Sequence, residues 1–344
     1  MKGNSLSELP ALHPAHLKYR CDPLGHLVLT AEAAMVGGGD QAAHFFGGAW
    51  TEAKLEIVAA YAKSFQTALK NQPFENWYID PFAGTGQRTE KRQSGGIFEG
   101  RPSEEEIVTF SGSAKRALEI SPHFDHYCFA DAKASHVDAL LALASEFPGR
   151  DIQVFHGDGN DCVRDVLTTA PWTGPNSWRQ RGIVFLDPYG MSVRWETLKL
   201  IASTRKLDVW FLFAAKAVRQ QLGGSIHDVD EAKAAALDRF FGEPNWREEF
   251  FRASEGQVTL FDIEPTAETA VNLSAIGAYA RKRFADEFCW VSEPKSLTVR
   301  NVPDYFQLYC MTNNNSEKAV ALVSRLHAGV VKAHVQASRR MSDR

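Results

Sequence analysis

The sequence WYIDPFAGTG at residues 77–86 decides the fold. Its first four residues predict a short strand that ends on Asp80, and Gly84 and Gly86 permit the sharp turn that follows. A strand that ends in a glycine-rich turn is typical of α/β proteins that bind a small ligand at the edge of a sheet. Thr89 holds the position of the third glycine of the dinucleotide fingerprint, which argues against a pyrophosphate site here.

Apolar strands and helical segments alternate along the chain after this loop. Continuous apolar strands separated by helices predict a parallel sheet covered on both faces. Two late apolar segments add a hairpin-like edge, for a total of seven strands. Strand count alone leaves a nicotinamide-binding Rossmann domain open. The further expected strands are His126–Asp131, Ile152–His156, Gly182–Asp187, Leu207–Phe213, Phe288–Ser292 and Tyr305–Thr312, and the expected helices are 51–70, Ser113–Ile120, Ala134–Glu146, Cys162–Thr168 and Glu196–Ser203.

Composition and periodicity divide the chain into five parts. The first part is rich in Pro, Gly and His and predicts a loosely structured leader, whereas the last is basic and predicts a frayed tail. Within the core, the polar residues 87–111 predict an inserted loop. The expected parts are the leader 1–48, the ligand-binding core 49–214, an inserted helical lobe 215–286, the last core strands 287–330 and the tail 331–344.

Charge and cysteine content exclude several classes of protein. The net charge of −4 gives no global basic field, so a nucleic-acid partner would require a local basic patch or an accessory subunit. The five cysteines are scattered without a CxxC spacing and the histidines are dispersed, which indicates neither a disulfide framework nor a metal site. No apolar run approaches the roughly 18 residues of a membrane span, and the N-terminus has no apolar signal core. We therefore expect a cytoplasmic protein without a membrane partner.

Acidic residues follow three of the predicted strands. Asp80 suits a cationic ligand that carries an amino group, Asp131 can accept the ribose hydroxyls of an adenosine, and Asp158 can meet the adenine amino group. Taken singly, Asp131 and Asp158 are equally compatible with helix caps or turns. Their order predicts a class I, Rossmann-like methyltransferase sheet that binds S-adenosyl-L-methionine through Asp80, Phe82, Ala83, Gly84, Gly86, Asp131 and Asp158.

Lys54 is a further candidate in the first predicted helix, where it could approach the carboxylate of the cofactor. A solvated helix lysine is the alternative interpretation. Trp172, Trp178 and the Arg179–Arg181 segment form a mixed aromatic and basic loop that could stack on and neutralise nucleic acid. A partly packed surface loop is the alternative for this segment.

Asp187-Pro188-Tyr189-Gly190 ends the most hydrophobic strand and provides the catalytic candidates Asp187, Pro188 and Tyr189. A carboxylate and a proline carbonyl offer two acceptors for the hydrogens of an exocyclic amine, and the tyrosine ring offers a surface on which its base can stack. Methyl transfer to such an amine is largely a matter of positioning. The alternative is a structural turn, because Pro and Gly punctuate turns.

Several of these motifs together resemble the three-Cys-motif partner protein (TcmP) family. The resemblance covers about residues 45–215 and implies a methyltransferase-like fold, a bacterial or phage setting and a companion protein with a three-cysteine, iron–sulfur-like motif. Two functions stay open: a methyltransferase for a nucleic-acid base or other amine, and a non-catalytic cofactor- or nucleotide-binding subunit of that companion. The shared motifs are the helix from Trp50 to Tyr61, the loop Tyr78–Gly86, Gly112-Ser113-Ala114, Gly157-Asp158-Gly159-Asn160 and Phe185–Gly190.

Overall fold

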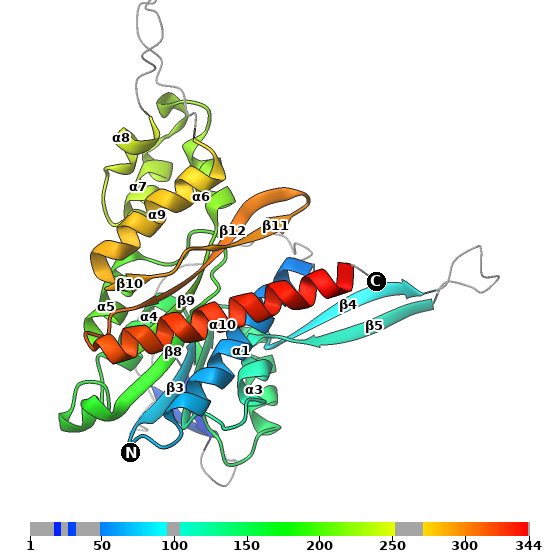
Figure 1. Ribbon diagram of the computed structural model, residues 1–344. Coiled ribbons are helices and arrows are strands. Elements are labelled where there is room, and N and C mark those ends of the chain that lie inside the picture. Colours follow the sequence, from blue (N-terminus) through cyan, green and yellow to red (C-terminus); the bar gives the residue numbers. More distant parts are fainter. Residues whose placement is uncertain (1–16, 22–26, 32–48, 95–103, 252–270, 343–344) are drawn as a thin grey trace, which may run out of the picture.

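The computed structural model describes residues 17–21, 27–31, 49–94, 104–251 and 271–342 (Figure 1). A large mixed β-sheet lies at its centre. Its strands are β1 (Leu17–Cys21), β2 (Leu27–Ala31), β3 (Glu75–Asp80), β6 (His126–Asp131), β7 (Asp151–His156), β8 (Gln180–Leu186), β9 (Leu207–Phe213), β10 (Trp290–Val291), β11 (Lys295–Val299) and β12 (Val302–Thr312). Their order is β10-β12-β9-β8-β3-β6-β7-β1-β2, with β11 paired to β12 outside this path.

The five strands at the centre of the sheet are parallel. The chain runs from β3 outward to β6 and β7, and then returns to the other side of β3 as β8 and β9. Ile79 of β3 pairs with Cys128 of β6 on one side and with Val184 of β8 on the other. This reversal creates a switch point between β3 and β8, where open α/β sheets bind their ligands. The predicted α/β fold class is therefore confirmed.

Helices cover both faces of the sheet (Figure 1). Alternate strand residues point to opposite faces, so Tyr78 packs with one group of helices and Ile79 with the other. The first group comprises α1 (Ala49–Leu69), α2 (Ser113–Leu118), α3 (Ala134–Ser145) and α10 (Glu317–Ser342). The second comprises α4 (Gly159–Leu167), α5 (Trp195–Thr204), α6 (Ala215–Leu222), α7 (Glu231–Phe241), α8 (Trp246–Phe250) and α9 (Leu273–Glu287), with short 3₁₀ turns at Pro175–Arg179 and Ile226–Asp228.

The helical region 215–286 shares one hydrophobic core with the sheet in its described parts. Phe213 of β9 contacts Phe240 of α7 at a ring distance of 5.5 Å and Phe284 of α9 at 6.1 Å. The helical character predicted for this region is correct for 215–222, 231–241, 246–250 and 273–287. These helices cover one face of the sheet, because their apolar sides bury Phe211 and Phe213 of β9.

Residues 87–111 are not the loop that their polar sequence predicts. In the described parts of this range, β4 (Gln87–Ser94) and β5 (Glu104–Ser111) form a two-stranded antiparallel ribbon, which projects away from the sheet (Figure 1). The prediction was wrong because it rested on polarity. Two paired strands satisfy each other's backbone hydrogen bonds and require no apolar face to do so.

The two ends of the chain are more ordered than expected in their described parts. The sheet has ten strands rather than seven, because β1 and β2 continue it beyond β7 and β11 pairs with β12. Residues 17–21 and 27–31 are therefore not a loose leader, whereas the rest of 1–48 lies outside the described residues. The expected frayed tail is helical up to Ser342, since α10 buries Val323 and Val330 against the α1 side of the core.

Candidate functional site

The acidic residues singled out in the sequence come together at the carboxyl edge of the parallel strands. Asp80 is the last residue of β3 and Asp131 the last residue of β6. Asp158 lies two residues after β7, and Asp187 immediately follows β8. Asp80 and Asp187 flank the switch point, so the expected ligand position and the expected acceptor position are neighbours.

Asp80 is fully buried beneath this edge. Its Oδ1 accepts a hydrogen bond from the Phe82 amide at 3.3 Å, while Oδ2 has no hydrogen-bond partner among the described residues. Burial raises the pKa of Asp80 to about 7, and the neighbouring Ser113 hydroxyl opposes this rise. The nearby charge of Asp187 raises this pKa further, and Lys54 lowers it. Asp80 thus offers a buried acceptor that a cationic donor would stabilise in its ionised form.

The two glycines of the loop Asp80–Gly86, called the cofactor loop below, have different roles. Both have positive φ angles, +60° at Gly84 and +68° at Gly86. A Cβ atom at Gly86 would lie 2.7 Å from Cδ2 of Leu143 on α3, so this glycine permits close packing. A Cβ atom at Gly84 would meet no described residue within 4 Å, so the described part of the chain leaves space beside the backbone there. Gly84 is therefore the glycine with room for a ligand.

The other two residues predicted in this loop are partly or fully packed. Ala83 is buried in the core beneath α1, and its amide donates to the carbonyl oxygen of Ala130 at 2.9 Å. The Phe82 ring lies against Gly159, where an added Cβ atom would come within 2.7 Å of it. These contacts fix the path of the cofactor loop across the ends of β3 and β6.

Lys54 does not behave as a solvated helix lysine. Lys54 is only 5% exposed. Its Nζ lies 2.5 Å from Oδ2 of Asp187 and 5.0 Å from the centre of the Trp50 ring. An ion pair between Glu52 and Arg116 links the same turn of α1 to α2. Lys54 therefore contacts the acceptor side of the site, whereas its predicted contact with a cofactor carboxylate stays a prediction.

The motif after β8 presents one fixed group and one exposed ring. The Asp187 side chain is 23% exposed, and Pro188 behind it is buried. Tyr189 is 67% exposed, which is unusual for a large aromatic residue in this protein. The turn is closed by Gly190 with φ +60° and by a hydrogen bond from the Ser192 hydroxyl to the Tyr189 carbonyl oxygen.

The remaining two acids already have partners within the protein. Oδ1 of Asp131 accepts from the Lys133 amide at 2.8 Å and lies 3.1 Å from Nδ1 of His136. Asp158 is the N-cap of α4, as its alternative interpretation supposes, and its Oδ2 pairs with Arg194 at 2.9 Å. The predicted contacts of these acids with ribose and adenine stay predictions.

Asn160 and Arg194 belong to this edge but were not predicted as site residues. Asn160 stands beside Asp158 in the Gly157–Asn160 segment, so its position after β7 was a signal that could have been used. Arg194 gave no sequence signal, because an arginine between an acceptor motif and a helix is most often a solvated residue. Both become visible only when α4 and the segment after β8 are seen together.

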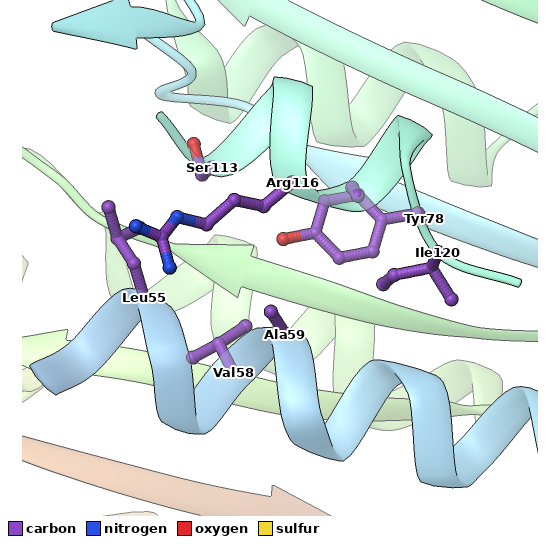
Figure 2. A pocket seen from close by; sticks show the side chains of 8 residues that line it. Leu55, Val58, Ala59, Tyr78, Ser113, Arg116 and Ile120 are labelled. Carbon is purple, nitrogen blue, oxygen red and sulfur yellow. The ribbon is translucent and has the colours of Figure 1, made fainter. Parts of the chain in front are cut away.

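A small pocket opens between α1 and α2, next to this site (Figure 2). Figure 2 shows the Tyr78 ring between the two helices, with its hydroxyl directed toward Arg116. The cavity volume of the pocket is about 10 Å³. Small-molecule sites usually hold roughly 300–1,000 Å³, so a whole cofactor would not fit here. The lining residues are Leu55, Val58, Ala59, Tyr78, Ser113, Arg116, Ala117 and Ile120.

The aromatic and basic loop before β8 lies at the opposite edge of the sheet. Trp172 is buried, whereas Trp178 is 54% exposed. Arg179 pairs with Glu75 at 3.4 Å, and Arg181 stacks on the Phe74 ring at 4.2 Å. These residues stand at the amino ends of β3 and β8, so they are not part of the candidate site.

Comparisons with known proteins give a distant fold likeness only. No protein-family description matches the chain, and no curated protein matches it. One similar solved structure is protein LPL1258 of Legionella pneumophila, from family DUF519, with 17% identity and a TM-score of 0.34 over 53% of this chain and 75% of that one. Another is yhhF of Escherichia coli, a candidate methyltransferase, with 11% identity and a TM-score of 0.29 over 74% of this chain and 86% of that one. Among the described residues, no helix is long and apolar enough to cross a membrane.

Proposed function

We propose that this protein is an S-adenosyl-L-methionine-dependent methyltransferase. The observation that carries the proposal is the Oδ2 atom of fully buried Asp80, which has no hydrogen-bond partner among the described residues and lies near the space that these residues leave beside Gly84 at the switch point. A buried carboxylate oxygen without a donor is costly unless a ligand satisfies it. The cationic amino group of this cofactor supplies such a donor, and the space at Gly84 lets the cofactor approach the backbone.

The charges at the site fit this cofactor. Lys54 and Asp187 neutralise each other at 2.5 Å, so an ionised Asp80 leaves one net negative charge in the buried part of the site. The cofactor carries a sulfonium, an ammonium and a carboxylate, with a net charge of one positive. In our proposal Asp80 binds the ammonium group, and Asp131 uses its remaining oxygen for the ribose hydroxyls.

The segment after β8 would hold the methyl acceptor. When bound, the cofactor supplies an electrophilic methyl group. The second carboxylate oxygen of Asp187, which does not contact Lys54, would accept a hydrogen bond from one N–H of an exocyclic amine. The Pro188 carbonyl oxygen would accept a hydrogen bond from the other N–H. The exposed Tyr189 ring would stack on the base that carries the amine. A base in a duplex would have to be flipped out to reach these groups.

The test has a binding step and a transfer step. Calorimetry with S-adenosyl-L-methionine comes first, and absence of binding at high protein concentration would refute the cofactor assignment. Transfer of a labelled methyl group to DNA, RNA and protein pools comes second. Asp187→Asn should abolish transfer and keep cofactor affinity within about tenfold, about 1.4 kcal/mol. Asp138→Asn, at an exposed position of α3, is the matched control and should behave like the wild type.

A cysteine-rich companion belongs to the same proposal. The motif resemblance to the three-Cys-motif partner family supports a cytoplasmic bacterial protein that works with a three-cysteine companion. Methyl transfer should therefore be assayed with and without that companion. Cofactor binding without transfer in either case would favour a non-catalytic partner subunit and count against the enzymatic proposal.

A further inference from the structure

Asn160 joins the segment that would hold the acceptor to the start of α4. Asn160 is 4% exposed, and both the nitrogen and the oxygen of its side-chain amide make hydrogen bonds. Nδ2 donates to the carbonyl oxygen of Ser192 at 2.9 Å and to Oδ1 of Asp158 at 2.8 Å. Oδ1 accepts from the Arg194 amide and from the Thr197 hydroxyl, both at 2.8 Å. The residues Asp187–Arg194, called the acceptor loop below, are therefore held at two backbone points by one side chain.

The backbone next to Asn160 also contacts the cofactor loop. A Cβ atom at Gly159 would lie 2.3 Å from the Pro81 carbonyl oxygen and 2.7 Å from the Phe82 ring. Only a residue without a side chain lets the chain lie this close. Gly159 therefore meets the cofactor loop on one side, and Asn160 holds the acceptor loop on the other.

We propose that Asn160 is a positioning residue that sets the acceptor loop relative to the cofactor loop. This proposal rests on the proposed function, in which the acceptor on Asp187 must line up with a methyl group held above Asp80. Methyl transfer depends on alignment, and a misplacement of about 1 Å can cost roughly a hundredfold in rate. Asparagine suits this role because its amide donates and accepts at once, whereas an aspartate side chain can only accept when ionised.

The principal experiment compares Asn160→Asp with Asn176→Asp. The first change keeps the size of the side chain but removes the donor to Ser192 and to Asp158. Asn176 is exposed and provides a matched change of charge. For Asn160→Asp we expect at least tenfold faster hydrogen exchange in residues 190–197 and at least a tenfold fall in kcat. Cofactor affinity should stay within threefold. Asn176→Asp should change none of these quantities.

Thr197 offers a milder perturbation if Asn160→Asp does not fold. Thr197→Val removes one donor to Asn160 Oδ1 and should lower kcat severalfold with faster exchange in the same residues. Thr197→Ser keeps the hydroxyl and should restore both values. A residue that only supported the fold would change the melting temperature without this split between kcat and cofactor affinity.

Gly159→Ala tests the other side of the junction. Its new methyl group would press on the cofactor loop, so cofactor affinity should fall at least tenfold while exchange in residues 190–197 changes less than in Asn160→Asp. Unchanged exchange in Asn160→Asp would overturn the positioning proposal, as would equal losses of kcat and cofactor affinity. If the wild type binds cofactor and transfers no methyl group, the exchange results still decide the role of Asn160, and only the proposed reaction fails.

Discussion

Cofactor affinity should depend on pH through Asp80. Burial raises the pKa of this carboxyl group from 3.8 to about 7, so near neutral pH about half of the molecules hold it protonated. Keeping it ionised at high pH costs about 4 kcal/mol by the usual 1.36 kcal/mol for each pKa unit. A cationic amino group bound at Oδ2 would favour the ionised form, and binding would therefore release a proton at low pH.

The size of the effect follows from this pKa. If only ionised Asp80 binds, affinity falls more than tenfold between pH 7 and pH 5.5, which is about 2 kcal/mol. The amino group of the cofactor stays charged over this range, because α-amino groups titrate near 7.7–8.0. Proton release on binding should rise from about 0.5 at pH 7 to nearly 1 at pH 5.5.

Isothermal titration calorimetry in two buffers of different ionisation enthalpy measures both affinity and proton release. Asp80→Asn should bind more weakly and show no release of this proton, while the Asp138→Asn control should follow the wild type. Affinity that is flat from pH 5.5 to 7, or an Asp80→Asn variant with wild-type behaviour, would refute the reasoning about Oδ2.

Three further predictions concern stability. Burial raises the pKa of Asp208 to about 6, so the stability that its protonated form contributes is present below about pH 4 and is lost as the pH rises through 6. Asp208→Asn should remove this loss. Urea unfolding should then show that the variant gains up to about 3 kcal/mol over the wild type at pH 8, relative to the difference between them at pH 4. No difference between the two pH values would contradict this expectation. Gly86→Ala should lower the free energy of unfolding by about 2 kcal/mol or more, because the new methyl group would press on α3 and the backbone has a positive φ angle. Gly84→Ala should lower it by about 1 kcal/mol and mainly weaken cofactor binding. Melting curves with and without cofactor measure both effects. Lys54→Met should destabilise the protein by about 3 kcal/mol, because it leaves Asp187 without its ion-pair partner. Adding Asp187→Asn to this variant should recover part of the lost stability. If the losses of the two single variants simply add, the two side chains are not coupled.

The central strands could be predicted from sequence because their apolar character is local. His126–Asp131 and Leu207–Phe213 have the predicted bounds, since each is a continuous apolar run between helical segments. The ribbon 87–94 and 104–111 could not be predicted, because its stability comes from pairing between two polar segments. The strands β1 and β2 were missed for the same reason: β2 pairs with β1, and β1 joins the sheet through β7, which lies more than a hundred residues later.

The candidate site was predicted where a residue follows its own strand. Asp80, Asp131 and Asp187 needed only the strand pattern to be placed at one edge. The partners of these acids depend on contacts between distant segments. Lys54 meets Asp187 only because α1 lies across the sheet beside β8, and Arg194 meets Asp158 only because α4 and α5 are neighbours. Periodicity carries no information about such pairs.

The packing of α10 against α1 has a consequence for how the chain is made. Helix α1 carries Lys54 and is synthesised early, whereas α10, which buries Val323 and Val330 on the same side of the sheet, is synthesised after β12 (Figure 1). Until α10 leaves the ribosome, the apolar side of α1 lacks part of its cover. Contacts between segments so far apart in sequence form slowly. The apolar side of α1, the helix that carries Lys54, is therefore fully covered only after α10 has been synthesised and has packed against it.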